Sequence, residues 1–185
     1  AQACGINVID QFRLNDVRAG GQGAPLAPIY HHALARRDQL MPTVVLNCGG
    51  IANVTVIADA DPLHLMAFDT GPGNVLLDRW VRMKTAGKLF FDHDGALARA
   101  GRIQPRVLQA LFEHGVVVEQ YNYFDLAPPK SLDSRHLQLI PEVSALSLED
   151  GCATLAAFTA HSIFLSVQRH YPQALSWPRW ILAGG

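Results

Sequence analysis

The 185-residue chain has few charged side chains, three cysteines and no long apolar run. Charged residues make up 17% of it, and 15 basic residues nearly balance 16 acidic ones. Because no basic run and no alternation of basic with aromatic residues is present, the sequence argues against nucleic-acid binding. No apolar run approaches the roughly 18 residues that span a bilayer, and residues 1–4 offer neither the basic region nor the apolar core of a signal peptide. We therefore expect no nucleic-acid or membrane partner and a cytoplasmic location.

The cysteines, Cys4, Cys48 and Cys152, are odd in number and include no Cys-x-x-Cys pair. This pattern fits reduced thiols that pack in a cytosolic protein better than a disulfide framework or a zinc site. With 49% hydrophobic residues, the chain can build one sizeable core and is neither disordered nor fibrous. Its length predicts one or two domains.

Two histidine and aspartate features resemble metal ligands but lack partners. His31-His32 and His93 have no second ligand at i+4, so surface or capping histidines are the better interpretation. Asp92 and Asp94 lie beside a glycine, yet the further acidic positions of an EF-hand are missing, which favours a turn and helix cap. No metal-ligating residue is predicted.

The hydrophobic pattern alternates strand and helix signals along the chain. The clearest strands are two β-branched runs joined through Gly49-Gly50, which read as a hairpin over residues 44–57. Further strands are predicted at residues 5–9, 63–68 and 180–183, the last one buried. Helices are predicted at residues 29–37, after residue 74, from 95 to 101, at 105–114 and from after Ser147 to about Tyr171.

Residues 68–74, Phe-Asp-Thr-Gly-Pro-Gly-Asn, set one acidic side chain at the end of a predicted strand, before a turn that opens a helix. Gly71 and Gly73 allow the backbone to approach a ligand closely, and Asn74 occupies the expected N-cap position. Free backbone N–H groups at such a helix start would favour a polar ligand oxygen and keep Asp69 ionised. Asp69 is therefore the predicted carboxylate base. The alternative is that Asp69 only caps the turn, a common role of aspartate.

The polar segment after residue 12 reads as a ligand-facing loop, because Arg13, Asp16 and Gln22 surround a glycine cluster. At the other end, a predicted strand runs straight into Gly184-Gly185 without the helix that such a turn normally feeds. Residues 1–42 hold too little apolar material for a core of their own. We therefore expect the chain to be the middle part of a longer protein.

Several motifs together resemble one known family. The segment Leu46–Thr55, with its Gly-Gly turn, resembles the second phosphate loop of the actin, hexokinase and heat-shock-ATPase superfamily, and residues 181–185 resemble its adenosine loop. The segment Asp16–Pro28 resembles the substrate-side loop of anhydro-N-acetylmuramic acid kinases. Four more segments are similar to that family in the same order: residues 68–74 with Asp78 and Trp80, residues 92–101, Pro129-Lys130-Ser131 and residues 152–162.

This resemblance implies a double reaction, in which the enzyme opens the 1,6-anhydro bond of the amino sugar with water and phosphorylates the freed 6-oxygen from ATP, with Mg²⁺ as cofactor. The general base of the family lies in the motif that Asp69 matches. The remaining implied contacts are Arg13, Asp16, Gln22, Gly71, Gly73 and Asn74 for the sugar, and Gly49, Gly50, Asn53, Gly184 and Gly185 for the nucleotide. A homodimer is a further expectation.

The sequence departs from the family in three places. The first phosphate loop, a Gly-Thr-Ser-x-Asp-Gly pattern, is missing. Leu132-Asp133-Ser134-Arg135 stands where Thr-Gly-Arg-Glu is usual, and Gln11 stands where an acidic residue commonly precedes Phe-Arg. We therefore expect the chain alone to be inactive. A non-catalytic sugar-binding or dimerisation module derived from the kinase is the alternative.

The expected architecture is an incomplete actin-like ATPase (ribonuclease H-like) α/β fold with a mixed sheet flanked by helices. Residues 1–42 would be the remnant of an N-terminal domain and its substrate loop. Residues 43–185 would form most of the C-terminal domain, with the hairpin and the strands at 63–68 and 180–183 in one sheet. Ligand sites of open α/β sheets gather at strand ends, so we expect Gly49, Asp69 and Gly184 to line a common cleft.

Overall fold

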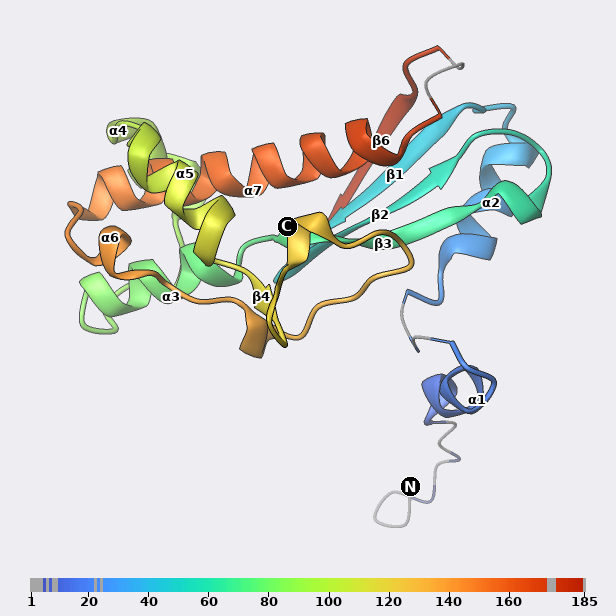
Figure 1. Cartoon of the computed structure of the whole chain (residues 1–185), viewed down its shortest axis with the longest axis horizontal. Coiled ribbons are helices and arrows are strands. Elements are labelled where there is room, and N and C mark those ends of the chain that lie inside the picture. The colour runs from blue at the N-terminus through green and yellow to red at the C-terminus, as the bar shows by residue number, and fades with distance from the viewer. Residues whose placement is uncertain are drawn as a thin grey trace.

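The computed structural model describes residues 5, 7, 10–21, 23, 25–172 and 176–184. Its centre is a mixed sheet of four strands in the order β3-β2-β1-β6 (Figure 1). The strands are β1 (Thr43–Cys48), β2 (Ile51–Ile57), β3 (Met66–Pro72) and β6 (Arg179–Gly184). The pairs β1–β2 and β2–β3 are antiparallel, whereas β6 runs parallel to β1. The predicted hairpin and the predicted mixed α/β fold are confirmed.

Helices flank this sheet and form a cluster beyond one end of it (Figure 1). The longest are α2 (Pro28–Arg37), α3 (Val75–Lys84), α5 (Pro105–His114) and α7 (Leu148–His170). Their bounds agree with the predicted helices, since proline opens α2 and α5 and the Ser147 hydroxyl accepts the N–H of Asp150 at the start of α7. The shorter helices are α1 (Phe12–Arg18), α4 (Ala96–Ala100) and α6 (Pro141–Ser144). A two-residue hairpin pairs β4 (Val117–Val118) with β5 (Tyr121–Asn122).

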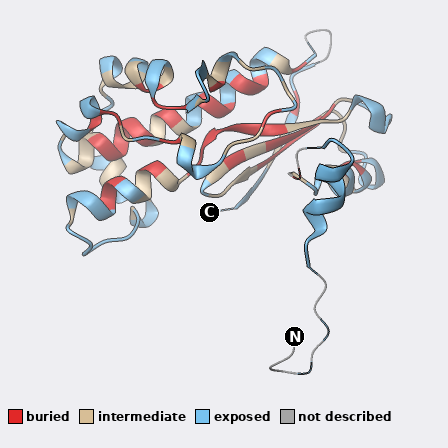
Figure 2. Ribbon diagram, turned by 60° about the horizontal axis from the view of Figure 1, so that its bottom comes forward, coloured by how far each residue is buried: buried red, intermediate tan, exposed pale blue. Residues whose placement is uncertain are grey.

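The two faces of the sheet pack against different helices. Alternate residues of the strands, such as Val54 and Phe68, form a buried cluster with Ile163 and Val167 of α7. The intervening residues face the other way, and Ile57 packs there with Ala35 of α2. Burial follows the same layers, with the strands and the inner side of α7 forming the buried interior (Figure 2). A separate core, centred on Trp80 and Phe158, joins α3, α5 and α7 beyond the sheet.

The third strand lies later in the chain than the sequence predicts. A strand was expected at residues 63–68, but Pro62–His64 is a short 3₁₀ helix and Leu63 is 88% exposed. The strand runs instead from Met66 to Pro72, because β2 offers pairing partners as far as Ile51 opposite Pro72. Asp69 is consequently inside the strand, not in a turn after it.

Two further predictions about local structure are wrong. The segment expected as a loop after residue 12 contains α1, which the absence of glycine and proline from residues 12–18 permits. The last strand, expected to be buried, is largely exposed, with Leu182 72% accessible. The reason is its position, since β6 lies at the edge of the four-stranded sheet and, among the strands that the structure describes, pairs with β1 alone. The strand predicted at residues 5–9 falls mostly outside the described residues.

Residues 10–42, where described, contribute no strand to the sheet, but α2 packs on it through Ala35. The division into domains at residue 42 stays a prediction. Within the described part of the chain, no helix combines the length and the apolar character needed to cross a membrane.

Candidate active site

Polar side chains form a row across the face of the sheet that α7 does not cover. Asp69 on β3 pairs with Asn53 on β2, which pairs with Asn47 on β1. The alternation of side chains places all three on the face opposite Phe68 and Val54. Thr55, two residues after Asn53 on the same face of β2, is covered by α2, because His31 lies 2.9 Å from its hydroxyl. Asp69, Asn53 and Asn47 therefore lie between α2 and the end of the sheet that carries the glycine turns.

Three hydrogen bonds from one loop hold Asp69. The hydroxyl of Tyr123 donates to the main-chain oxygen of Asp69 at 2.6 Å. The N–H of Asp69 donates to the oxygen of Lys130 at 3.1 Å, and the N–H of Leu132 donates to the carboxylate Oδ2 at 2.7 Å. With only 8% of Asp69 exposed, the carboxylate is fixed in one place and keeps one oxygen outside these bonds. Sequence reasoning missed Tyr123 and Leu132 because neither belongs to a motif with Asp69.

The surroundings of Asp69 raise the pKa of its carboxyl group. Burial is the largest cause, because the ionised form loses hydration. The Leu132 N–H and the positive charge of Arg13 act in the opposite direction but do not cancel the effect of burial. A fixed carboxylate with a raised pKa has the properties of a general base near neutral pH.

On the opposite face of the sheet, α7 fixes the backbone of β3 and of the turn that follows it. Ser166 donates its hydroxyl to the main-chain oxygen of Thr70 at 3.2 Å, and Thr159 donates to that of Gly73 at 2.7 Å. The strand approaches α7 so closely at Gly71 that a Cβ there would lie 2.8 Å from the Ser162 hydroxyl, and the φ of Gly71 is 146°. Only glycine fits this position, so Gly71 serves packing as well as any ligand.

The start of α3 is hydrogen-bonded to the hairpin turn. The N–H groups of Gly73 and Val75 donate to the oxygen of Gly50, and that of Asn74 donates to the oxygen of Gly49, at 2.8 to 3.1 Å. These groups were expected to be free for an anion, but the hairpin carbonyls already accept them. Asn74 stands at the N-cap, yet its side chain does not cap the helix. A Cβ on Gly73 would lie 2.0 Å from the Gly49 oxygen, so the contact requires glycine.

A cavity of about 640 Å³ opens beside the hairpin turn. Gly49, Gly50 and Asn74 line it together with Asp78 and with the loop around Asp92. Both carboxylate oxygens of Asp92 accept N–H groups of α4, from Leu97 and Ala98. Within the described residues, no group of three or more histidine, cysteine or acidic side chains is arranged to hold a metal ion.

The structure brings only part of the predicted site together. Gly49, Asp69 and Gly184 all lie toward one end of the sheet, but Asp69 and Gly184 are not among the residues that line the hairpin cavity. Their sharing one cleft stays a prediction. Arg13 and Asp16 lie on α1, where Asp16 accepts the N–H of Gly23 at 2.7 Å and so closes its own loop. Gln22 and Gly185 lie outside the described residues.

The sheet, its flanking helices and the glycine turns at the strand ends are those expected of part of an actin-like ATPase domain. Comparison of the sequence with protein families agrees, since the anhydro-N-acetylmuramic acid kinase family matches residues 1–185. The chain belongs to this family.

Curated relatives carry the same family name. The anhydro-N-acetylmuramic acid kinase of Paramagnetospirillum magneticum is 43% identical over 100% of this chain and 48% of its own length. That of Rhodospirillum rubrum is 45% identical over 100% of this chain and 45% of its own. That of Caulobacter vibrioides is 49% identical over 89% of this chain and 41% of its own. The chain thus spans about half the length of the curated relatives it matches.

Proposed function

We propose that the full-length protein containing this chain is an ATP-dependent kinase that opens 1,6-anhydro-N-acetylmuramic acid and phosphorylates its 6-oxygen, giving N-acetylmuramic acid 6-phosphate for peptidoglycan recycling. The observation that carries the proposal is the buried, clamped carboxylate of Asp69, whose pKa is raised by burial. The names of the relatives support the class of reaction. The enzyme would work in the cytoplasm, without nucleic-acid or membrane partners, and a homodimer fits the proposal.

In this reaction Asp69 takes a proton from water, and the water oxygen attacks the anomeric carbon of the sugar. The anhydro carbon–oxygen bond breaks, and the freed 6-oxygen accepts the γ-phosphoryl group of ATP while ADP leaves. Fixing Asp69 through Tyr123 and Leu132 keeps the base in reach of the water, and small displacements of a base cost large factors in rate. Arg13, Asp16, Gln22, Gly71, Gly73 and Asn74 are the proposed contacts and edge of the sugar site.

The nucleotide side of the site is proposed at the hairpin turn. Gly49, Gly50 and Asn53 would lie near the phosphates, and Gly184 and Gly185 near the adenosine. Asp78, Asp92 and Asp94 line the cavity beside Gly49, and both carboxylate oxygens of Asp92 already accept N–H groups of α4. This donor set suits an Mg²⁺ ion that arrives with the ATP phosphates and keeps its waters, which is how Mg²⁺ usually binds in kinases. Mg²⁺ would supply neutralisation of the charge on the transferring phosphoryl group.

The test is an ADP-release assay with ATP and 1,6-anhydro-N-acetylmuramic acid, run on the full-length protein and on the 185-residue chain. We expect turnover by the full-length protein only, because the chain lacks a first phosphate-loop pattern and spans about half of its relatives. Turnover by the chain alone would contradict the proposed inactivity of the fragment.

The second candidate is a non-catalytic sugar-binding or dimerisation module. It is favoured by the loop that departs from the family, because Arg135 forms an ion pair with Asp133 at 3.1 Å and is not left free for a substrate. Sugar binding by the full-length protein without ADP release would select this candidate.

A further inference from the structure

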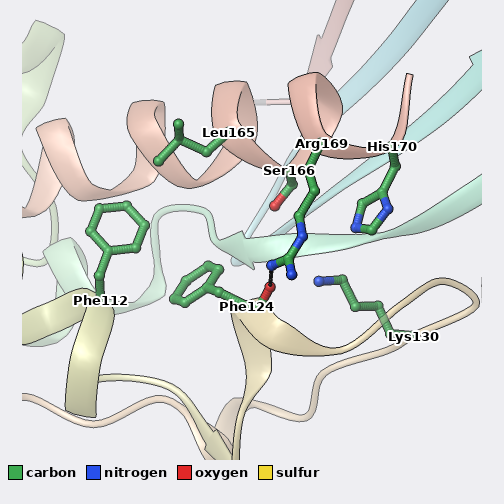
Figure 3. Close-up of a pocket in the computed structure, with 7 residues that line it drawn as sticks. All are labelled: Phe112, Phe124, Lys130, Leu165, Ser166, Arg169 and His170. Atoms are coloured by element: carbon green, nitrogen blue, oxygen red, sulfur yellow. Dashed lines mark hydrogen bonds between the residues drawn. The ribbon is translucent and has the colours of Figure 1, made fainter. Parts of the chain in front are cut away.

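Behind the strand that carries Asp69, three basic side chains converge on a second cavity. Lys130, Arg169 and His170 line it together with Ser166, and the phenyl rings of Phe112 and Phe124 and the side chain of Leu165 complete its wall (Figure 3). The cavity measures about 150 Å³, which is large enough for several water-sized groups. It lies on the α7 side of the sheet, whereas Asp69 points to the other side, so it is separate from the candidate active site.

Lys130 is a buried cation on which Asp125 acts through its charge but not through an ion pair. It is 6% exposed, and within the described residues no carboxylate forms an ion pair with it. Its ammonium group donates to the main-chain oxygen of Tyr123 at 3.2 Å and lies 4.5 Å from the centre of that ring. A buried charge normally has an ionic partner, because removing it from water is costly. The ammonium therefore has donor capacity to spare next to the cavity.

His170 is the second incompletely satisfied group. Its Nε2 atom is buried and has no hydrogen-bond partner among the described residues. The ring packs edge-on against Phe68, with 5.4 Å between ring centres, which keeps the imidazole in place. A buried polar atom without a partner is uncommon and calls for a ligand or a water.

Arg169 completes the basic rim. Its guanidinium donates to the oxygen of Phe124 at 2.7 Å and lies 3.8 Å from Asp125, an exposed carboxylate whose charge also acts on Lys130. Burial and the charge of Arg169 lower the pKa of Lys130 to about 8. Burial, Lys130 and Arg169 lower the pKa of His170 in the same way. In its protonated form His170 is repelled by Lys130 and Arg169, and an anion between the three groups would relieve that repulsion.

We propose that this cavity binds a small oxyanion, held by Lys130, Arg169 and His170. The aromatic and aliphatic side chains at its other end suit a short-chain carboxylate, whereas the charges alone would also suit inorganic phosphate. The two ligands share the oxyanion chemistry and can be told apart by experiment. The main-chain oxygen of Lys130 accepts the N–H of Asp69. The residue that would hold the anion through its side chain therefore contacts the active-site strand through its backbone.

The experiment titrates the full-length protein with sodium propionate and, separately, with sodium phosphate, at constant ionic strength kept with chloride. Thermal unfolding and the NMR signals of the His170 ring report binding. We expect saturable stabilisation by at least one anion and a rise in the pKa of His170 on saturation, since an anion favours the charged imidazolium. An effect of propionate alone identifies a carboxylate ligand, an effect of phosphate alone a phosphate, and both support the site.

The variants are Lys130→Met and Arg169→Gln, with Lys84→Met as the control. Lys84 also stacks on an aromatic ring, Trp80, at 4.8 Å, but it does not line the cavity. Charge-assisted hydrogen bonds are strong enough that either cavity variant should weaken binding by roughly tenfold or more, while Lys84→Met binds as wild type. If Lys130→Met does not fold, Arg169→Gln decides, because its side chain is more than half exposed. No saturable binding by either anion, or equal binding in the cavity variants, overturns the proposal.

Discussion

Tyr123 donates its hydroxyl to the main-chain oxygen of Asp69 at 2.6 Å, although the two residues are 54 positions apart in the chain. Both groups are buried, and Lys130 and Leu132 complete the same clamp from the residues that follow Tyr123. The loop over residues 123–132 is therefore a structural part of the candidate active site and not merely a connection between helices.

Removing the Tyr123 hydroxyl should destabilise the protein. In Tyr123→Phe the buried oxygen of Asp69 loses its donor, and an unsatisfied buried group costs about 1–3 kcal/mol. We expect the free energy of unfolding of the full-length protein, measured with urea, to fall by that amount. The control is Tyr121→Phe, because Tyr121 is 63% exposed and should change stability by less than about 0.5 kcal/mol. Equal effects of the two substitutions would contradict the clamp.

Replacing the proposed base should remove turnover without removing nucleotide binding. In the full-length protein, Asp69→Asn should lower kcat by at least about 100-fold, the usual contribution of a positioned general base, and leave ATP affinity nearly unchanged. The matched control is Asp61→Asn, because Asp61 is exposed and its carboxylate likewise accepts a backbone N–H, that of Leu63. If Asp69→Asn turns over nearly as fast as the wild type, Asp69 is not the base and has a structural role.

The acidic limb of the pH profile should report the carboxyl group of Asp69. The base must be deprotonated, so kcat should fall as the pH drops through a pKa above the ordinary aspartate value of 3.8. Burial raises this pKa, and the folded protein therefore binds more protons than the unfolded chain between 3.8 and the raised value. Stability contributed by Asp69 is lost as the pH rises through that window.

It follows that Asp69→Asn should raise the melting temperature at pH 7, where the wild-type carboxylate is buried in its ionised form. The amide oxygen of asparagine can still accept the N–H of Leu132. Differential scanning calorimetry at pH 7 measures the change. A marked loss of stability at that pH would show that the ionised carboxylate stabilises the fold, contrary to the cost expected from its burial.

Gly73→Ala should disrupt the contact between α3 and the hairpin turn. A Cβ at this position would lie 2.0 Å from the oxygen of Gly49, which is backbone and cannot rotate away. Such overpacking typically costs about 1–3 kcal/mol of folding stability. Gly50→Ala is the control for stability alone, because a Cβ there would meet only Val75 at 3.8 Å. Equal unfolding free energies for the two variants would show that the turn adjusts freely.

Local signals in the sequence determined much of the fold. Proline at the first position and an apolar stripe define α5 from Pro105 to His114, and the Ser147 cap defines the start of α7, because helix ends depend on residues within a turn of them. The Gly49-Gly50 hairpin is a local feature of the same kind. The motif around Asp69 also sufficed to select the residue proposed as the base.

The tertiary structure decided where β3 ends and what surrounds Asp69. A strand ends where its partner stops offering hydrogen bonds, so Ile51 on β2 extends β3 to Pro72. The N–H groups predicted to be free at α3 are used by the hairpin carbonyls, and Leu132 reaches the Asp69 carboxylate from 63 positions away. Burial, which raises the pKa of Asp69, is likewise a property of the packed chain. Hydrogen bonding and desolvation between distant segments leave no local pattern, which is why only the folded chain determines them.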